Sequence, residues 1–121
     1  MIISALFLLQ IKHFICDFVL QSEYQISKKS VYGHGAGLIH AGTHIIGSIP
    51  ALLTISASPV PIGACLVFEF FVHYHADWLK ARFDNRRGAH KDRTWWTMFG
   101  LDQLVHQLTY VGMLYFLTGA A

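Results

Sequence analysis

Residues 68–80 of the chain read Phe68-Glu69-Phe70-Phe71-Val72-His73-Tyr74-His75-Ala76-Asp77-Trp78-Leu79-Lys80. This stretch belongs to a long apolar segment, yet Glu69, His73 and Asp77 recur at intervals of four residues. On a helix this spacing places the three side chains on one face. Ionisable residues are costly inside a membrane and usually serve a function there. The stretch therefore predicts a membrane helix with one functional polar face.

Three other apolar segments carry polar pairs with the same spacing of four residues. These pairs are His13 with Asp17, His40 with His44, and Asp102 with His106. The spacing puts both members of each pair on one face of their helix. His75 lies about 200° round the helix from His73, so we expect it to form a separate interhelical hydrogen bond. Together the four segments predict one shared polar site.

The composition is that of a membrane protein with a single domain, residues 1–121. Hydrophobic residues make up 54% of the chain and charged residues 13%, and the mean hydropathy is +0.42. The formal net charge of +2 is too small to indicate a nucleic-acid partner. Cys16 and Cys65 lie in apolar segments without metal-ligand spacing, so we expect buried thiols and no disulfide.

Four apolar segments define the expected helices, at about 1–21, 36–56, 61–82 and 98–120. At about 1.5 Å per residue, each is long enough to cross a hydrocarbon core of about 30 Å. The first segment lacks a basic leader and a small-residue cleavage site, so we expect it to be retained as a helix. The sequence therefore predicts an all-α fold, a four-helix transmembrane bundle.

Basic residues gather in two of the three connections. The first connection holds Lys28 and Lys29, and the third is flanked by or contains Lys80, Arg82, Arg86, Arg87, Lys91 and Arg93. The positive-inside rule places both connections in the cytoplasm and both termini on the non-cytoplasmic side. With this topology all four polar pairs fall in one layer, roughly 5–14 Å below the cytoplasmic interface. Polar residues placed for unrelated reasons would not be expected to share a depth.

Histidines and carboxylates at one depth predict a divalent-metal site. The candidate ligands are His13, Asp17, His40, His44, His73, Asp77, Asp102 and His106. Imidazole and carboxylate suit zinc first, with iron or manganese as alternatives, and the set is large enough for one or two ions. Some of the aspartates would instead orient a histidine. Two other interpretations stay open: a proton or ion pathway, and hydrogen bonds that only hold the helices together.

Further residues are candidates for catalysis and substrate binding. Glu69 and Asp77 are the catalytic candidates, although Glu69 could equally be a buried acid bonded to a neighbour, and Lys12 is expected to snorkel or to pair with a partner. The candidates for substrate binding are Gln21, Lys80, Gln103, Arg86 and Arg87. The basic third connection has two readings, as a topology signal that attracts anionic lipid or as a phosphate grip.

The ordered motifs resemble those of a known family. They are His13-x-x-Cys16-Asp17-Phe18-x-Leu20-Gln21, Lys28-Lys29, His40-x-x-x-His44, His73-x-x-x-Asp77-x-x-Lys80 and Asp102-Gln103-x-x-His106. This pattern resembles the DUF3307 family, small bacterial and phage-borne integral membrane proteins without an assigned function. Glu69 and His75 lie outside it. The resemblance implies a multi-pass protein of the bacterial inner membrane, and a looser similarity is to membrane-bound metal-dependent hydrolases.

The leading hypothesis is a metal-dependent membrane hydrolase. It would act at the cytoplasmic leaflet on a lipid or on a lipid-linked phosphate or ester, since a metal with an open coordination position activates water. One alternative is a metal-ion or proton carrier or channel that uses the same polar residues. Another is a non-enzymatic membrane interaction protein in which these residues are structural. Membrane lipid is the partner expected in the leading hypothesis.

Overall fold

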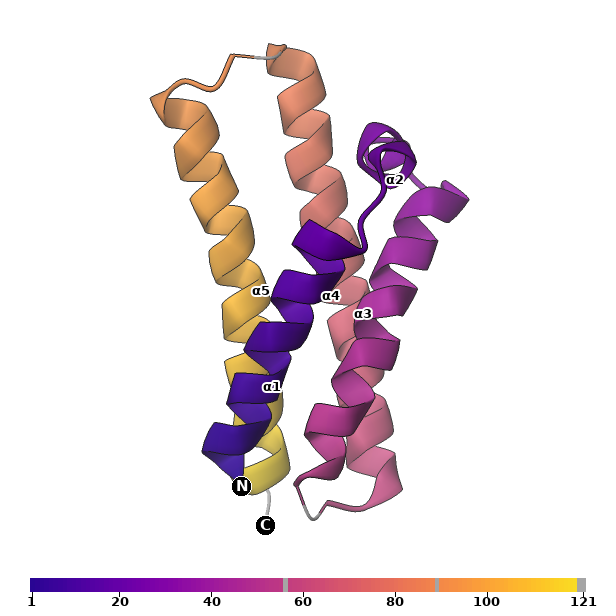
Figure 1. Ribbon diagram of the computed structural model, residues 1–121, viewed down its shortest axis with the longest axis vertical. Coiled ribbons are helices and arrows are strands. Elements are labelled where there is room, and N and C mark those ends of the chain that lie inside the picture. Colours follow the sequence, from indigo (N-terminus) through magenta and orange to yellow (C-terminus); the bar gives the residue numbers. More distant parts are fainter. Residues whose placement is uncertain (56, 89, 120–121) are drawn as a thin grey trace.

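The protein is α-helical. The computed structural model describes residues 1–55, 57–88 and 90–119, and none of these residues forms a strand (Figure 1). The elements in chain order are α1 (Ile2–Phe14), the π-helix η1 (Ile15–Val19), α2 (Glu23–Lys28), α3 (Gly35–Leu53), α4 (Pro59–Arg87) and α5 (Arg93–Gly119). The all-α prediction is therefore confirmed.

The four long helices form an up-and-down bundle. Helix α3 packs against α1 and α4, and α5 packs against α4 and α1, so the order round the bundle is α1, α3, α4, α5. Figure 1 shows both termini and the α3–α4 connection at one end, with α2 and the α4–α5 connection at the other. The two basic connections of the sequence thus lie at the same end of the molecule.

Two helix ends and one helix differ from the expected bounds. Helix α4 continues past the expected end to Arg87, and α5 begins before the expected start, at Arg93. The expected bounds were set where the apolar segments give way to charged residues. Lys and Arg are good helix formers, so the helices extend into the charged stretch. The short α2 was not expected; Ser22 and Gln25 form a capping box at its start. The expected segment ends at residues 56 and 120 lie outside the described residues.

The last turn of the first segment is a π-helix. In η1 the backbone N–H of Leu20 donates to the Ile15 carbonyl over 2.8 Å, five residues back. Such turns occur mostly as single bulges and often at functional sites. Asp17 lies inside this turn. The widened turn therefore presents the one carboxylate that the first segment contributes.

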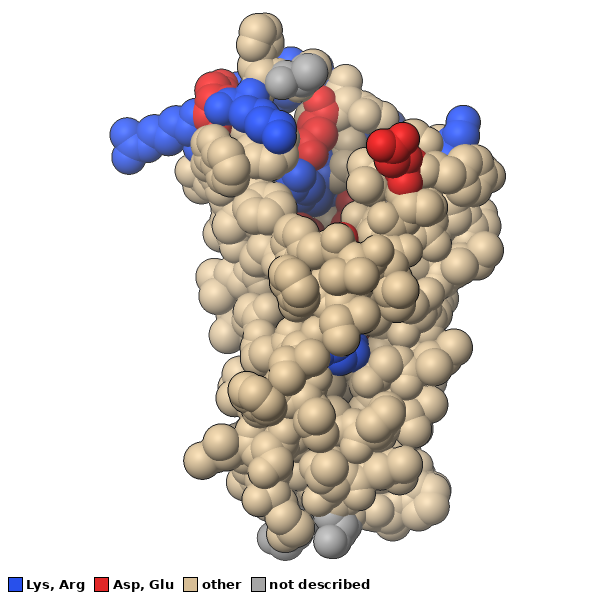
Figure 2. All heavy atoms as spheres, in the orientation of Figure 1, with Lys and Arg blue, Asp and Glu red and all other residues tan. Residues whose placement is uncertain are grey.

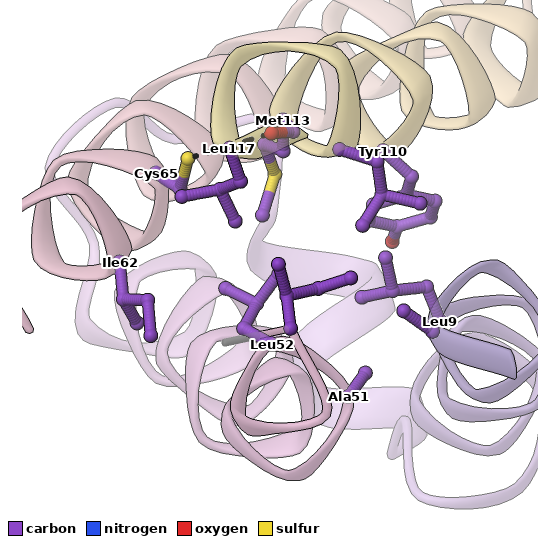
Figure 3. Packing of buried hydrophobic residues seen from close by; sticks show 11 residues of the cluster. Leu9, Ala51, Leu52, Ile62, Cys65, Tyr110, Met113 and Leu117 are labelled. Atoms are coloured by element: carbon purple, nitrogen blue, oxygen red, sulfur yellow. Dashed lines mark hydrogen bonds between the residues drawn. The ribbon is translucent and has the colours of Figure 1, made fainter. Parts of the chain in front are cut away.

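The half of the bundle nearest the termini has an apolar core. Figure 3 shows Leu9, Leu52, Ile62 and Leu117 from the four helices converging there. The core also includes Ala5, Ala51, Ile55, Cys65, Tyr110, Met113 and Leu114. Both cysteines are buried free thiols, as predicted. This apolar layer closes the bundle on the side of the termini.

Many large hydrophobic side chains are exposed on the outside of the bundle. Figure 2 shows charged side chains gathered at one end, above a face formed almost wholly by other residues. Two stretches, Ile2–Val19 and Gly35–Leu53, are long and apolar enough to cross a membrane. The other two long helices do not meet this criterion within the described residues, whereas four spans were expected. Residues such as Glu69, Asp77 and Asp102 lower the mean hydropathy of α4 and α5.

Candidate metal centre

Three helices each present three polar residues at intervals of four. These triplets are His40, His44 and Ser48 on α3; Glu69, His73 and Asp77 on α4; and Asp102, His106 and Tyr110 on α5. Lys12 and His13 from α1 and Asp17 from η1 complete the set. The spacing of four gives each helix one polar face, and the bundle turns these faces inward. His40, His44, His73 and His106 are each at most 2% exposed.

The first donor group consists of Asp17, His40, His44 and His73, whose ligand-capable atoms all lie within 4.8 Å of one another. The Oδ1 atom of Asp17 lies 2.9 Å from His44 Nε2 and 3.0 Å from His40 Nε2. The Nε2 atoms of His40 and His73 are 3.4 Å apart. Ligand atoms on a tetrahedral zinc, with bonds of about 2.1 Å, lie about 3.4 Å apart. The separations in this group lie on both sides of that value, so the four residues could hold a metal ion.

The second donor group consists of His73, Asp77 and His106. Asp77 Oδ2 lies 3.4 Å from His73 Nε2, and Asp77 Oδ1 lies 3.5 Å from His106 Nε2. Within the described residues, His73 Nδ1 and both ring nitrogens of His106 are buried without a hydrogen-bond partner. Buried polar atoms are nearly always satisfied, so these three nitrogens call for a bound ion or water. His73 is common to both groups.

His13 is placed as an orienting residue and belongs to neither donor group. Its Nδ1 lies 2.9 Å from the Tyr110 hydroxyl, and its Nε2 lies 3.0 Å from Gln103 Oε1 and 3.2 Å from Asp17 Oδ2. With the Tyr110 hydroxyl donating to Nδ1, the Nε2–H is left to donate to Gln103 and Asp17. This arrangement orients the Asp17 carboxylate toward His40 and His44, the other members of the first donor group that it contacts.

A buried ion pair lies on the terminal side of the donor groups. Lys12 Nζ donates to Glu69 Oε1 over 2.5 Å, and Ser48 Oγ donates to the same oxygen over 2.9 Å. Lys12 Nζ also lies 3.2 Å from His44 Nδ1 and 3.0 Å from the Tyr110 hydroxyl. The partner-paired reading of Lys12 is confirmed. The contacts of Glu69 match a buried acid bonded to neighbours, one of the two roles considered for it.

A polar cavity of about 230 Å³ lies on the opposite side of the donor groups, toward the charged end. Its wall includes Asp17 and Asp77, one carboxylate from each donor group. Lys29 Nζ, in the same wall, pairs with Asp77 Oδ2 over 2.7 Å. Lys80 Nζ, also in the wall, pairs with Asp84 over 2.6 Å. The donor groups are therefore reached from the charged end of the bundle.

The formal charges near the donor groups do not balance. Counted formally, with every histidine neutral and every carboxyl group ionised, Asp17, Asp77 and Asp102 supply three negative charges against the one ammonium group of Lys29. The Lys12–Glu69 pair is neutral and adds nothing. The layer thus carries a formal charge of −2, in a place where a charge without a counter-charge is costly.

The predicted substrate-binding residues separate into two sets. Gln21, Lys80 and Gln103 line the polar cavity, and Gln21 also bonds to the His40 ring over 3.1 Å. Asp102 lines it as well, 3.9 Å from His106 Nδ1. The structure does not bring Arg86 or Arg87 to this cavity. Arg86 lies in a different groove, and Arg87 pairs with the exposed Asp92 over 2.6 Å.

Three further residues of the site were missed from sequence. Ser48 lies four residues after the predicted pair His40 and His44, and Tyr110 lies four residues after the predicted pair Asp102 and His106. Extending each pair by one more interval of four would have found both residues. Lys29 carries no such signal, because a loop lysine reaches Asp77 only through the folded path of the chain. His75, expected to bond between segments, lies 3.0 Å from the Tyr32 hydroxyl through its Nε2.

Comparison with known proteins identifies a family and gives no activity. No curated protein and no solved structure matches the chain at a significant level. The family model described as "Protein of unknown function (DUF3307)" matches residues 5–120, nearly the whole chain. That match covers α1 from Ala5 onward, the other three long helices and every residue of both donor groups. The protein described here therefore belongs to the DUF3307 family.

Proposed function

We propose that all four long helices cross a bilayer. Large apolar side chains such as Phe7, Ile46, Phe71 and Tyr115 are more than half exposed, and water-soluble monomers rarely expose so much apolar surface. The buried residues, by contrast, include ten polar or charged ones. A hydropathy average counts these inward residues as though they faced lipid, and this accounts for the low values of α4 and α5. The protein is then a multi-pass protein of the bacterial inner membrane.

We infer that the charged end faces the cytoplasm. Lys28, Lys29 and the basic residues of the α4–α5 connection lie at this end, which is the distribution that the positive-inside rule associates with the cytoplasmic side. Both termini then lie on the non-cytoplasmic side. The polar cavity opens toward the cytoplasmic leaflet in this orientation.

The donor groups are proposed to bind a divalent metal ion. The spacing of the first donor group supports this, and the formal charge of −2 matches one divalent cation. Zinc suits the mixture of imidazole and carboxylate best, and iron or manganese would accept the same donors. Asp77, one of the candidate metal ligands, also borders the polar cavity. A metal bound to Asp77 would therefore be accessible to a substrate in that cavity. If two ions bind, His73 would serve only one of them, because a neutral imidazole has a single free lone pair.

The proposed activity is hydrolysis of a lipid or of a lipid-linked phosphate or ester. The observation that carries it is the second donor group, which offers three ligands and borders the polar cavity through Asp77; catalytic zinc sites keep three protein ligands and an open fourth position. A metal there would polarise the scissile bond and activate water. Lys29 and Lys80 would bind an anionic group in the cavity, while Gln21 and Gln103 hold the His40 and His13 rings.

The apolar core argues against a metal or proton carrier. A carrier must reach its ion from both sides of the membrane. Here Leu9, Leu52 and Met113 are at most 1% exposed and fill the bundle between the ion pair and the termini (Figure 3). Access from the charged end alone suits an enzyme that acts on one leaflet.

The test uses the purified protein in mild detergent with phosphatidic acid in mixed micelles. Release of inorganic phosphate and of fatty acid is measured after chelation and after addition of zinc or manganese. We expect turnover that requires metal and is lost in His73→Ala, but is kept in His90→Ala, which changes an exposed histidine outside the site. Metal-loaded, folded protein without either product would contradict a phosphatase or esterase acting on this lipid and would favour the non-enzymatic alternative.

A further inference from the structure

A second cavity lies beside the polar one, on the outer side of α4 and α5. This α4–α5 groove has a volume of about 510 Å³, within the range of about 300–1,000 Å³ typical of ligand sites. Lys80 and Asp102 line both the groove and the polar cavity. The two spaces therefore share a wall at the level of the donor groups.

The groove has an apolar part and a cationic end. Trp78, Leu79 and Phe83 of α4 face Leu101 and Val105 of α5 across it. Arg82 and Arg86 also line it, toward the charged end of the bundle. From Ala76 to Arg86 the groove follows α4 for ten residues, about 15 Å at 1.5 Å per residue.

Arg82 and Arg86 differ from the other cations that line or border the groove. Among the described residues neither Arg82 nor Arg86 forms an ion pair, whereas Arg87 pairs with Asp92 and Lys80 with Asp84. The face of Trp78 lies 5.8 Å from the Arg82 guanidinium and helps to hold it over the groove. Arginine binds phosphate oxygens through paired N–H donors. A cationic end on an apolar groove complements a lipid with an anionic headgroup.

We propose that the α4–α5 groove binds one membrane lipid with an anionic phosphate headgroup, with an acyl chain along Leu101 and Val105 and the phosphate at Arg82 and Arg86. This inference rests on the proposed membrane location, and it deepens the proposed function by naming the substrate class and its entry side. A lipid held there lies beside the wall that separates it from the donor groups. Lys80 and Asp102 line both the groove and the polar cavity that borders the donor groups.

The test is native mass spectrometry of the detergent-solubilised protein with phosphatidic acid and, separately, with phosphatidylcholine. We expect phosphatidic acid to bind more tightly than the zwitterionic lipid. The double variant Arg82→Gln/Arg86→Gln is expected to weaken phosphatidic acid binding by at least about tenfold. The matched control Lys28→Gln/Arg93→Gln removes two exposed cations from the same end of the molecule, outside the groove, and is expected to bind like the parent.

A second pair of variants tests the apolar part. Leu101→Trp fills the groove and is expected to reduce binding, whereas Leu108→Trp, on the same helix and outside the groove, is not. Equal binding of both lipids, or equal losses in test and control variants, would overturn the proposal. So would a dimer that Leu101→Trp dissociates, because a second copy of the chain would then occupy the groove.

The outcomes separate this inference from the proposed function. Selective lipid binding with bound metal but no hydrolysis would leave the groove assignment intact and remove the hydrolase. The opposite result is also possible to distinguish. If Arg82→Gln/Arg86→Gln changes neither metal-dependent hydrolysis nor lipid affinity, the hydrolase proposal would stand and the assignment of the groove would be overturned.

Discussion

At the scale of single residues, the buried Lys12–Glu69 pair connects the polar layer to the apolar core. Both side chains are almost fully buried, at 6% exposure for Lys12 and 0% for Glu69. Each charged group is therefore shielded from water and is stabilised by the other. Isolated charges in such surroundings are costly, whereas a paired and hydrogen-bonded one is tolerated. The Glu69 carboxylate therefore balances the charge of Lys12. The Lys12 ammonium group in turn contacts His44 and Tyr110.

Removal of one partner of this pair is expected to destabilise the fold strongly. Lys12→Met leaves the Glu69 carboxylate buried without its counter-charge, at a cost of about 3–5 kcal/mol in the free energy of unfolding. The double variant Lys12→Met/Glu69→Gln should recover part of this loss. Detergent-induced unfolding followed by circular dichroism measures both, with the exposed Lys28→Met as control. A Lys12→Met protein as stable as the parent would refute the role given to the pair.

Lys29 is expected to oppose metal binding. Its ammonium group lies 2.7 Å from Asp77, a ligand candidate, and a cation at that distance repels a second cation. Lys29→Met should therefore raise zinc affinity on the order of tenfold, measured by competition with a chelating dye. Lys28→Met removes a neighbouring exposed charge and should leave the affinity unchanged. Lower affinity in Lys29→Met would instead mean that Lys29 holds Asp77 in place for the metal.

At the scale of elements, α1 and α3 approach closely at Gly47. A Cβ atom added there would lie 2.8 Å from Lys12 Cγ and 3.5 Å from Cys16 Sγ. The Lys12 stem has little freedom to move, because its ammonium group is bound to Glu69. At Gly42, on the same helix, a Cβ atom would meet nothing within 4 Å. These two glycines make a matched pair.

Gly47→Ala is expected to destabilise the protein by about 1–3 kcal/mol through overpacking. Gly42→Ala should be neutral or stabilising by up to about 1 kcal/mol, because alanine is the better helix former. The unfolding assay used for Lys12→Met compares the two. Equal effects at both positions would show that α1 and α3 do not pack as closely as described.

Much of each helix could be predicted from sequence, because periodicity is a local property. The spacing of four in His40–His44 and His73–Asp77 fixes which side chains share a face before the fold is known. The π-turn that holds Asp17 could not be predicted, since no residue type marks it. Nor could the partner of Lys12, because the order of helices round the bundle and their rotation decide that Lys12 meets Glu69.

At the scale of the whole molecule, the predicted topology is open to direct test. The charged end is expected in the cytoplasm and the α3–α4 connection outside. In a background with Cys16 and Cys65 replaced by alanine, Ser58→Cys should react with a membrane-impermeant maleimide on intact spheroplasts. Lys91→Cys should react only after permeabilisation. The reverse pattern would invert the orientation, and equal labelling of both positions in intact cells would contradict a membrane-spanning bundle.

The polar pairs of the four segments lie at one level of the bundle because the four long helices run up and down (Figure 1). Residues counted from the same end therefore meet, as His44 and His73 do with ring centroids 3.7 Å apart. Counting residues from the helix ends could not show which of the candidate residues would belong to a donor group. His13 and Asp102 lie at the right level, yet the first makes hydrogen bonds to Tyr110 and Gln103 and the second lines the cavity.

Elemental analysis of the purified protein by mass spectrometry measures whether the polar layer binds metal. His73 belongs to both donor groups and His106 to the second alone. The account predicts near-stoichiometric metal in the parent and in the exposed-residue control His90→Ala. It predicts loss of metal in His73→Ala and, if two ions bind, loss of one in His106→Ala. Folded parent protein without metal, or with metal unchanged in folded His73→Ala, would contradict the account.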